Sequence, residues 1–519
     1  MNISLIYQYP NYGLEIISAC LKKKGHDTKI ILMVKPAFFN TKMDLFFKNP
    51  HDEKSMDVMI NLLKDSDLIG ISLTTNLLQD AIQITKKIKK ELKIPIIWGG
   101  IHPTIKPEEC LEYADMVCRG EGEEAIVELV EKMEKGENYL DTKNICFKNK
   151  NGKITLNPLR PLLQDLDSIP FPDWDLKTQY LILEGKTYKM NEISNKVLSN
   201  KVLGANVYNT ILEAKKYRTM FTRGCPFGCS YCCNNYFNKL YSGQNILRKR
   251  SVDNVIEELK KIKENLPFFE LIIFEDDNFF YLSTEEIKEF SEKYKKEIGL
   301  QFALSGHPLT ITREKLKYLA DAGLIILKMG IQTCSEKTKK LYKRNYPNSQ
   351  IENTCKIINE FRDKIKGVIY DIILDNPWET EEDLIKTLIF LNKLPTPYFL
   401  LIFSLVLFPG TELYDLAKKE NLIKNELENI YQKHFMDYTK KYINSLFALL
   451  AIYAKTGRKI HTITIFLLTN KLLRKLRLSL ILYWFFRIKI YILYILDRIN
   501  KITWSQILKL SKLHPFTNL

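Results

Sequence analysis

The sequence lacks the marks of a secreted or membrane-spanning chain. Its start, Met1–Tyr7, has neither a basic segment nor a cleavage site, so it is expected to form a strand and not a signal peptide. The longest apolar run, Leu478–Leu496, is interrupted by Arg487 and Lys489, and charge near the centre of a span is costly. Ten cysteines without a secretion signal suit a reducing interior. We therefore expect a cytoplasmic protein, with a peripheral position at the inner face of the membrane as the alternative.

Acidic residues are scarce in one part of the chain only. The net charge is +16, and residues 437–519 hold fifteen Lys or Arg against Asp437 and Asp497, whereas the rest is nearly balanced. No recognised nucleic-acid-binding module accompanies this charge, so no nucleic acid is expected as a partner. Two explanations stay open: a helix on a membrane surface, anchored by aromatic residues such as Trp484 and Phe485, or a basic helical domain packed on the rest.

Three cysteines stand close together at C-x3-C-x2-C spacing: Cys225, Cys229 and Cys232. Thiolates are the usual ligands of iron–sulfur clusters, and a cubane cluster ordinarily takes four, so three would leave one iron open for chemistry. A zinc knuckle would need a fourth ligand nearby, but the nearest downstream histidine is His307. The adjacent Cys233 is expected to be a neighbour and not a ligand. The bland alternative is three unrelated cysteines among ten.

Residues 1–140 alternate short apolar runs with amphipathic stretches. The runs predict strands at Ile3–Tyr7, Lys29–Met33, Leu68–Leu73, Pro95–Trp98 and Met116–Cys118. Helices are expected over Glu15–Lys24, Gln79–Leu92 and Glu123–Glu134. Strands that alternate with helices predict an α/β domain with a doubly wound parallel sheet, which binds ligands at the carboxyl ends of its strands.

Three turns follow these predicted strands and carry the candidate ligand-binding residues. Paired glycines let the backbone approach a bulky ligand closely, although such turns taken alone are more often structural. The candidates are Ser72, Thr74, Gly99, Gly100, His102, Gly120, Glu121 and Gly122. Of these, His102 is expected to be a turn residue.

The remainder divides into three parts. Residues 141–217, with a proline-rich stretch over 157–175, are expected to be a linker and lead-in. Residues 218–422 alternate six apolar runs with helices, which predicts a partial (β/α)6 TIM-type barrel. The runs are Thr219–Thr222, Leu271–Phe274, Gln301–Leu304, Ile325–Ile331, Val368–Leu374 and Leu401–Val406. Residues 423–519 form the basic, mainly helical C-terminal region.

Polar residues follow three of the predicted barrel strands, at the edge where barrel enzymes bind their ligands. They are Glu275, Asp276 and Asp277 after the second strand, Gln332 and Arg344 after the fourth, and Asn376 and Pro377 after the fifth. Carboxylates favour a nearby ammonium group, and an amide can both donate and accept a hydrogen bond. A solvated turn is the alternative explanation for the three acids.

The cysteine spacing resembles that of radical S-adenosylmethionine (SAM) enzymes. The turns GG-x-HPT at 99–104 and GEGE at 120–123, the DLDSIPFP stretch at 165–172 and PGTEL at 409–413 are similar to class B members, which carry a cobalamin-binding domain. The D-x-H-x-x-G loop, which supplies a cobalt-ligating histidine in other cobalamin proteins, is absent, and Asp375 and Trp378 replace glycines of the family's G-x-P-G-E-T turn.

The resemblance implies cofactors and site residues. A [4Fe-4S] cluster on Cys225, Cys229 and Cys232 would bind SAM at its open iron and split it into methionine and a 5′-deoxyadenosyl radical. The rim residues named above would contact SAM, and the N-terminal turns would contact cobalamin. His102 would not serve as an axial cobalt ligand.

The resemblance also implies a reaction class and partners. Hydrogen abstraction from an unactivated carbon would precede cobalamin-dependent methyl transfer or ring formation on an apolar substrate, with a lipid as one possibility. Flavodoxin or ferredoxin would donate electrons. The alternatives are a radical SAM oxidoreductase or cyclase without cobalamin, and a non-enzymatic iron–sulfur sensor or binding module.

Overall fold

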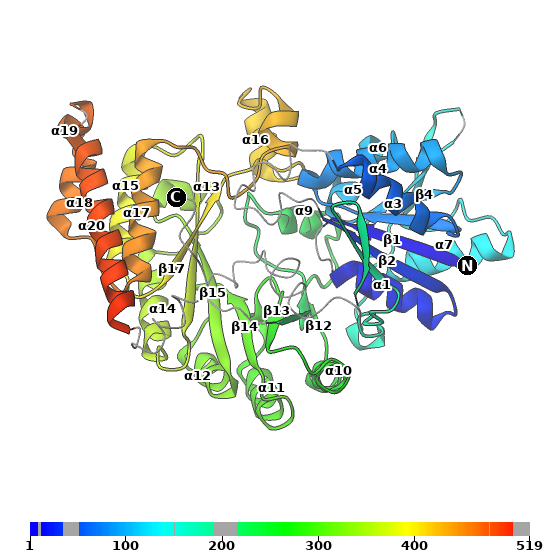
Figure 1. The fold of residues 1–519 in the computed structure, drawn as a ribbon, viewed down its shortest axis with the longest axis horizontal. Helices are drawn as coiled ribbons and strands as arrows, with labels where there is room; N and C mark the ends of the chain where they lie inside the picture. The colour runs from blue at the N-terminus through cyan, green and yellow to red at the C-terminus, as the bar shows by residue number, and fades with distance from the viewer. Residues whose placement is uncertain (9–11, 35–50, 150, 191–214, 477, 502–519) are drawn as a thin grey trace, which may run out of the picture.

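The computed structural model describes residues 1–8, 12–34, 51–149, 151–190, 215–476 and 478–501. Figure 1 shows an N-terminal sheet domain at one end, a second sheet in the middle, and the C-terminal helices at the far end. The expected order of an α/β sheet, a barrel and a helical region is confirmed.

The N-terminal sheet has nine strands in the order β7-β6-β5-β4-β3-β1-β2-β8-β9. The six from β5 to β8 in this order run parallel, and β6, β7 and β9 pair antiparallel. Their bounds are β1 Asn2–Tyr7, β2 Asp27–Met33, β3 Leu68–Ser72, β4 Ile96–Gly99, β5 Met116–Cys118, β6 Ile145–Lys148, β7 Ile154–Leu156, β8 Gln179–Leu183 and β9 Lys186–Lys189. The order reverses between β1 and β3, which places the ligand-binding switch point of a doubly wound sheet there.

This sheet extends beyond residue 140, where the sequence had placed its end. The stretch expected to be a linker supplies β6, β7, β8 and β9, and β8 continues the parallel sheet by pairing with β2 from Ile30↔Gln179 to Met33↔Ile182. These strands are short and lie beside prolines and charged residues, so their apolar pattern is weak. Pairing with strands distant in sequence stabilises them.

Helices cover both faces of the N-terminal sheet. They are α1 Tyr12–Lys23, α3 Glu53–Leu63, α4 Leu78–Glu91, α5 Ile101–Ile105, α6 Pro107–Cys110 and α7 Glu123–Lys135. The sequence had not predicted α3, whose N-terminus is capped by Asp52 through the backbone NH of Ser55. The Trp98 side chain is fully buried in β4 and donates its indole NH to Thr85 Oγ1 of α4 at 3.0 Å, which joins sheet to helix.

The central sheet has six parallel strands in the sequential order β10-β13-β14-β15-β16-β17, as the barrel prediction required. Their bounds are β10 Lys216–Thr219, β13 Leu271–Phe274, β14 Gln301–Gly306, β15 Leu324–Gln332, β16 Gly367–Leu374 and β17 Phe399–Ser404. A separate cluster of small and branched side chains fills the space inside the strands: Leu271, Ile273, Ala303, Ile326 and Ile369.

The first barrel strand lies earlier in the sequence than predicted. Residues Lys216–Thr219 form β10, whereas Thr222–Arg223 form β11, which pairs antiparallel with β12 (Arg248–Lys249). The sequence prediction for Thr219–Thr222 merged these two strands, because the apolar residues between them do not interrupt the pattern. The two-stranded ribbon leads directly into the cysteine loop.

Helices surround the barrel, and side chains cap the starts of most of them. They are α9 Cys233–Leu240, α10 Val252–Asn265, α11 Thr284–Glu297, α12 Arg313–Ala322, α13 Glu336–Leu341, α14 Asn348–Glu360, α15 Glu381–Lys393 and α16 Glu412–Lys419. Ser283 and Glu286 form a capping box at the start of α11, and Thr380 with Asp383 forms a second one at the start of α15.

The C-terminal region is helical, with α17 Tyr442–Lys455, α18 Thr462–Thr469, α19 Lys471–Lys475 and α20 Leu478–Lys501. Over the described residues, none of the helices combines the length and apolar character needed to cross a membrane. Asp375, at the end of β16, attaches this region to the barrel. Its carboxylate accepts bonds from Ser404 Oγ (2.7 Å), the Thr439 NH (2.8 Å) and Asn444 Nδ2 (2.9 Å).

Asp375 has a backbone conformation that few residue types tolerate. Its φ of 61° lies in the left-handed region, which asparagine, aspartate and glycine tolerate best. Burial alone would raise the pKa of Asp375, but bonds from Thr439, Ser404 and Asn444 outweigh it and hold the pKa below 3.8. The residue is therefore an ionised anchor near neutral pH.

We predict that Asp375→Asn loosens α17. Bonds to a charged group are worth about 1.5–3 kcal/mol, so amide hydrogens of α17 should exchange roughly tenfold to a hundredfold faster at neutral pH. The folded-state pKa is depressed, so the lost stability belongs to the range above pH 3.8. Asp321→Asn, which removes an exposed carboxylate paired with Lys364, is the matched control. Equal exchange in both variants would contradict the anchoring role.

Candidate functional site

The three predicted cluster ligands lie on one loop between β11 and α9, at the carboxyl end of the barrel. Two asparagines of α9 hold this loop: Asn235 Nδ2 donates to Gly228 O at 2.8 Å, and Asn238 Nδ2 donates to Cys225 O at 2.9 Å. The loop begins at Gly224, with a φ of 88°, where an added Cβ would lie 2.3 Å from Ile246 O. Only glycine fits this turn without displacing the backbone.

The cysteine thiols influence one another. Burial raises the pKa of Cys225 to about 12, and smaller contributions come from Asp277 and the thiols of Cys232 and Cys229. The pKa of Cys232 is lowered, chiefly by a hydrogen bond from the Cys233 thiol. Cys233 therefore acts as a partner of Cys232, which agrees with its expected role as a neighbour.

The donor set fits a cluster better than a single ion. Among the described residues, no group of three Cys, His, Asp or Glu side chains converges as a metal-ion site. A cubane cluster has a separate iron for each thiolate, so its ligands need not point to one centre as zinc ligands do. Three thiols on one loop, with no carboxylate or imidazole among them, suit iron and sulfide.

Asp276 positions the loop and does not face a ligand. Its carboxylate accepts bonds from the Phe221 NH (3.1 Å), the Thr222 NH (2.5 Å) and Thr222 Oγ1 (2.6 Å), and the side chain is buried. Burial raises the pKa of Asp276 to about 6, although these bonds act the other way. The predicted SAM contact at Asp276 is therefore corrected to a link between β13 and the ribbon that leads to the cysteines.

The other two acids of this turn have different surroundings. Glu275 forms an ion pair with Arg218 at 3.4 Å, across the ends of β10 and β13. Asp277 lies at the rim, where a hydrogen bond links it to Asn234 at the start of α9, and partial desolvation of its carboxylate raises its pKa. Of the three acids, Asp277 is the one that lies beside the cysteine loop and stays open.

Arg344 connects the cysteine loop to β15. Its guanidinium donates to Gly330 O at 2.6 Å, to Tyr231 Oη at 3.4 Å and to Cys229 Sγ at 3.8 Å. The side chain is buried and packs over the Tyr346 ring. The predicted cofactor residue is thus in contact with a cluster ligand, where a fixed positive charge favours a thiolate.

Two amide side chains at neighbouring strand ends have unused hydrogen-bonding atoms. Gln332 ends β15 at a bulge with a φ of 70°, and its Oε1 is buried without a partner among the described residues. Asn376 accepts from the Trp378 NH at 3.0 Å, while its Nδ2 has no partner there. Pro377 is exposed. Buried polar atoms without partners are rare, and a bound SAM would satisfy both amides.

The switch point of the N-terminal sheet also holds an unsatisfied amide. Gln8 directly follows β1, is buried, and makes no hydrogen bond through either side-chain polar atom within the described part of the chain. Ser72, Gly99 and Gly100 lie at the same edge, and Gly100 has a φ of 104°, with room for no Cβ beside Leu73 O. This edge fits a large polar ligand, as a cobalamin site requires.

Two of the residues predicted to bind a ligand at this edge make hydrogen bonds or packing contacts within the protein. His102 is fully buried, with Nδ1 3.2 Å from Thr75 Oγ1 and its ring edge-on to Tyr431. Burial lowers the pKa of His102 to about 4, so the ring is neutral. Thr74 is exposed and donates to Asn76 Oδ1. His102 is a packing residue of the turn and is corrected out of the ligand-binding set.

The GEGE turn binds the barrel. Arg248 Nη1 lies 2.5 Å from Glu121 Oε1, and Arg223 Nη1 lies 2.6 Å from Glu123 Oε1 and 3.4 Å from Glu121 Oε1. We call this set of four residues the interdomain latch. Both arginines belong to the ribbon of β11 and β12. Glu121, predicted as a cofactor contact, instead holds the cysteine loop's ribbon against the sheet edge.

The two glycines of this turn are packed against protein atoms. A Cβ on Gly120 would lie 1.9 Å from Tyr241 Oη, at the end of α9, and one on Gly122 would lie 3.1 Å from Ile17 Cδ1. The predicted close approach is present at these glycines, and the atoms approached belong to Tyr241 and Ile17.

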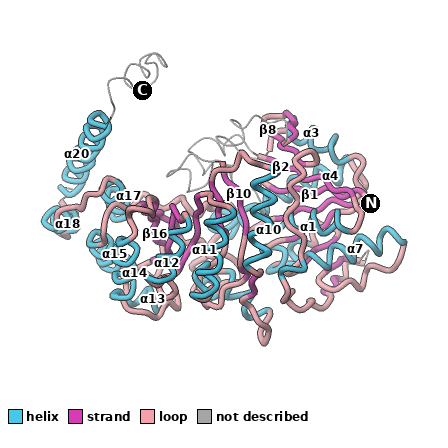
Figure 2. The backbone as a smooth tube through the Cα atoms, turned by 90° about the horizontal axis from the view of Figure 1, so that it is seen from below, coloured by secondary structure: helices cyan, strands magenta, loops and turns pink. Residues whose placement is uncertain are grey.

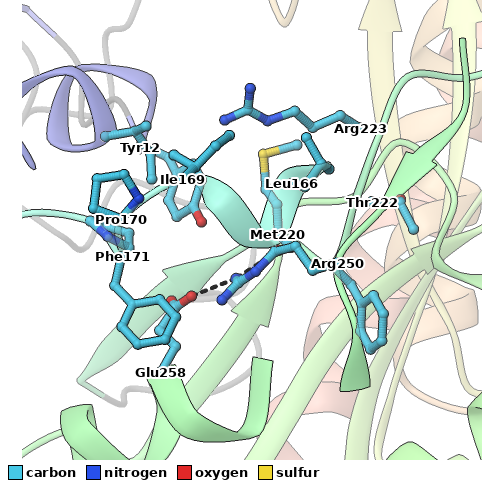
Figure 3. Close-up of a pocket in the computed structure, with 13 residues that line it drawn as sticks. Tyr12, Leu166, Ile169, Pro170, Phe171, Met220, Thr222, Arg223, Arg250 and Glu258 are labelled. Carbon is cyan, nitrogen blue, oxygen red and sulfur yellow. Dashed lines mark hydrogen bonds and ion pairs between the residues drawn. The ribbon is translucent and has the colours of Figure 1, made fainter. Parts of the chain in front are cut away.

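A small crevice lies between the domains beside the latch (Figure 3). The crevice is lined by Tyr12 of α1, by Pro170 and Phe171 of the proline-rich stretch, and by Arg250 and Glu258 of the barrel. Arg250 and Glu258 form an ion pair at 2.5 Å. The crevice's volume of about 20 Å³ leaves room for one water. A crevice of this size between the domains is too small to hold a substrate.

Sequence reasoning missed four of these residues: Gln8, Arg223, Arg248 and Asp375 as a structural anchor. Arginine and glutamine are common surface residues, so nothing in the pattern marked them. For Asp375, the aspartate at a position where the resemblance implied a glycine was the signal that could have marked it.

Two family models match the chain. The Radical SAM superfamily model covers residues 219–391, and the B12 binding domain model covers residues 1–130. An uncharacterised methyltransferase of Pyrococcus horikoshii is 27% identical over 80% of each chain. An anaerobic magnesium-protoporphyrin IX monomethyl ester cyclase of Rubrivivax gelatinosus is 26% identical over 56% of this chain and 47% of its own length.

The fold is also found among solved structures. The radical SAM methyltransferase TsrM of Kitasatospora setae, solved with tryptophan and a SAM analogue, aligns with a TM-score of 0.58 at 15% identity. The alignment covers 80% of this chain and 76% of that one, so the likeness spans both the N-terminal sheet and the barrel.

We predict that Asp276→Asn disorders the cysteine loop. An amide has one acceptor oxygen where the carboxylate serves three donors, so we expect a loss of about 1–3 kcal/mol of stability and lower iron content after anaerobic reconstitution. Asp253→Asn, at a carboxylate that is 80% exposed, is the control. Full iron loading of Asp276→Asn would contradict the positioning role.

The two matched families meet in this chain in the order sheet domain, then barrel, and the three cysteines lie inside the second match. The thiol set fits a [4Fe-4S] cluster, and the unsatisfied amides at the barrel rim and at Gln8 fit SAM and cobalamin. The chain therefore combines a radical SAM domain with a B12 binding domain, and in this it resembles the cobalamin-dependent radical SAM enzymes.

Proposed function

We propose that the protein cleaves SAM reductively, abstracts hydrogen from an unactivated carbon, and completes the reaction by methyl transfer or ring formation. One observation carries the proposal: the cysteine loop is fixed to the ligand-binding edge of the N-terminal sheet by the interdomain latch. A carbon radical and a carried methyl group react only when both cofactors face one space, and the latch supplies that arrangement.

The cofactors supply the electron that splits SAM and the methyl group that is transferred. The chain's residues bind and orient them. Cys225, Cys229 and Cys232 would hold the cluster, and Arg344 contacts the Cys229 thiol. Gln332 and Asn376 offer a free acceptor and a free donor to SAM.

The substrate is proposed to be an apolar small molecule or a lipid with one polar group. The cluster of Leu271, Ile273, Ala303, Ile326 and Ile369 forms an apolar plug inside the barrel. Above this plug, Lys328 forms an ion pair with Asp371 at 3.3 Å, and its ammonium lies 5.8 Å from the centre of the Phe403 ring. Burial raises the pKa of Asp371 to about 6. An apolar body would pack on the plug while a polar group meets this pair. The electron donor is proposed to be a flavodoxin or ferredoxin.

Anaerobic reconstitution tests the proposal. The reduced protein with SAM should form 5′-deoxyadenosine and bind about one cobalt per chain, and lipid extracts from the reaction should contain a methylated or cyclised product. Replacing all three cysteines by alanine should abolish 5′-deoxyadenosine. No 5′-deoxyadenosine from the loaded protein would favour an iron–sulfur sensor, and turnover without cobalt would make the N-terminal domain a scaffold.

We predict that Arg344→Met lowers the midpoint potential of the cluster. Loss of a positive charge and of an N–H···S bond at Cys229 destabilises the reduced, more negative cluster, so reductive cleavage of SAM should slow. Redox titration followed by electron paramagnetic resonance measures the shift. Lys356→Met is the control, because Lys356 is exposed and pairs with Glu352 within α14. An unchanged potential in Arg344→Met would exclude this role.

A further inference from the structure

The outward face of α20 is apolar. Its exposed side chains include Ile481, Trp484 and Phe485, which are 67%, 54% and 60% exposed. Leu478, Leu480, Ile488 and Ile492 continue the same face. A helix on a protein surface ordinarily turns polar residues outward, so this face calls for an occupant.

The opposite face of α20 is already used. Ser479, Tyr483 and Ile490 are buried, and Tyr442 of α17 donates to Ser479 O at 3.2 Å. Figure 2 shows α20 projecting from the edge of the molecule beyond α17 and α18. The exposed apolar face is therefore the outer surface of a docked helix.

The neighbouring helices extend this surface. Ile463 and Phe466 of α18 and Leu472 and Leu476 of α19 are each about three-fifths exposed. We call the exposed apolar residues of α18, α19 and α20 together the C-terminal apolar face. It spans three consecutive helices, which exceeds what scattered surface residues of a monomer would show.

The charge around this face favours one kind of occupant. No acidic residue occurs between Asp437 and Asp497, while Lys475 and Lys489 are exposed beside the apolar side chains. Arg474 and Lys471 pair with Glu381 and Glu382 of α15, and so contribute less. A second copy of the chain would bring like charges together, whereas an anionic bilayer would pair them.

We propose that the C-terminal apolar face inserts into the surface of an anionic lipid bilayer, with α20 lying in the interface and not crossing it. Arg487 and Lys489 in the middle of the helix oppose a crossing orientation, and Arg487 lies over the Trp484 ring, the kind of pair that suits the headgroup level. This proposal goes beyond the proposed catalytic function and is independent of it.

Vesicle flotation of the full-length protein tests it, because binding requires no cofactor turnover. The protein should float with phosphatidylcholine vesicles that contain phosphatidylglycerol, bind pure phosphatidylcholine at least about tenfold more weakly, and lose affinity as salt rises. Lys475→Glu with Lys489→Glu should weaken binding at least about tenfold.

Two further variants separate insertion from general stickiness. Ile481→Glu with Phe485→Glu should abolish flotation, whereas Leu140→Glu, at a 56% exposed leucine of the N-terminal domain, should leave it unchanged. Circular dichroism checks that each variant is folded. Failure to float with anionic vesicles would overturn the proposal, and so would a dimer in analytical ultracentrifugation that the Ile481→Glu, Phe485→Glu pair dissociates. Equal binding to neutral vesicles at all salt concentrations would overturn the anionic requirement.

Discussion

The four charged groups of the interdomain latch set the geometry on which the rest of the molecule depends. Arg223 and Arg248 reach from the two strands of one ribbon to Glu121 and Glu123 of one turn. Arg248 is almost fully buried, and breaking a buried pair by removing one partner leaves an uncompensated charge, which costs several kcal/mol. The ligand-binding edges of two separate sheets are thereby held facing each other.

The cysteine loop is supported on three sides because of this arrangement. The latch holds the ribbon that precedes it, Asp276 fixes the same ribbon to β13, and Arg344 ties the loop's centre to β15. Phe227, within the loop, stacks on His307 at 4.1 Å between ring centres, which closes the side toward β14. A loop supported in this way can hold a metal cluster while leaving one position open.

The strands and helices of both sheets could be predicted from the sequence because each has a strong local period. The predicted strands Leu271–Phe274 and Met116–Cys118 agree to the residue with β13 and β5, and the predicted helix Glu123–Glu134 corresponds to α7. The strands between residues 141 and 190 could not, because pairing with distant strands stabilises them more than their own pattern does. The three cysteines could be identified from their spacing, because ligands of one cluster must lie close together. The roles of Glu121 and Asp276 could not be identified from the sequence, because a carboxylate that binds arginine or backbone NH groups has the same sequence signal as one that binds a ligand.

The contact between Gly120 and Tyr241 limits how this protein can be recombined. The glycine belongs to the sheet domain and the tyrosine to the barrel, and the atoms leave no space for a larger residue between them. Chimeras that exchange one domain for a relative's must carry the matching partner, or the join will be forced open at this point. Strands β8 and β9 follow the proline-rich stretch in the sequence, but in space they belong to the N-terminal sheet. A workable breakpoint therefore lies after Lys189, and not at the proline-rich stretch where a designer who read only the sequence would cut.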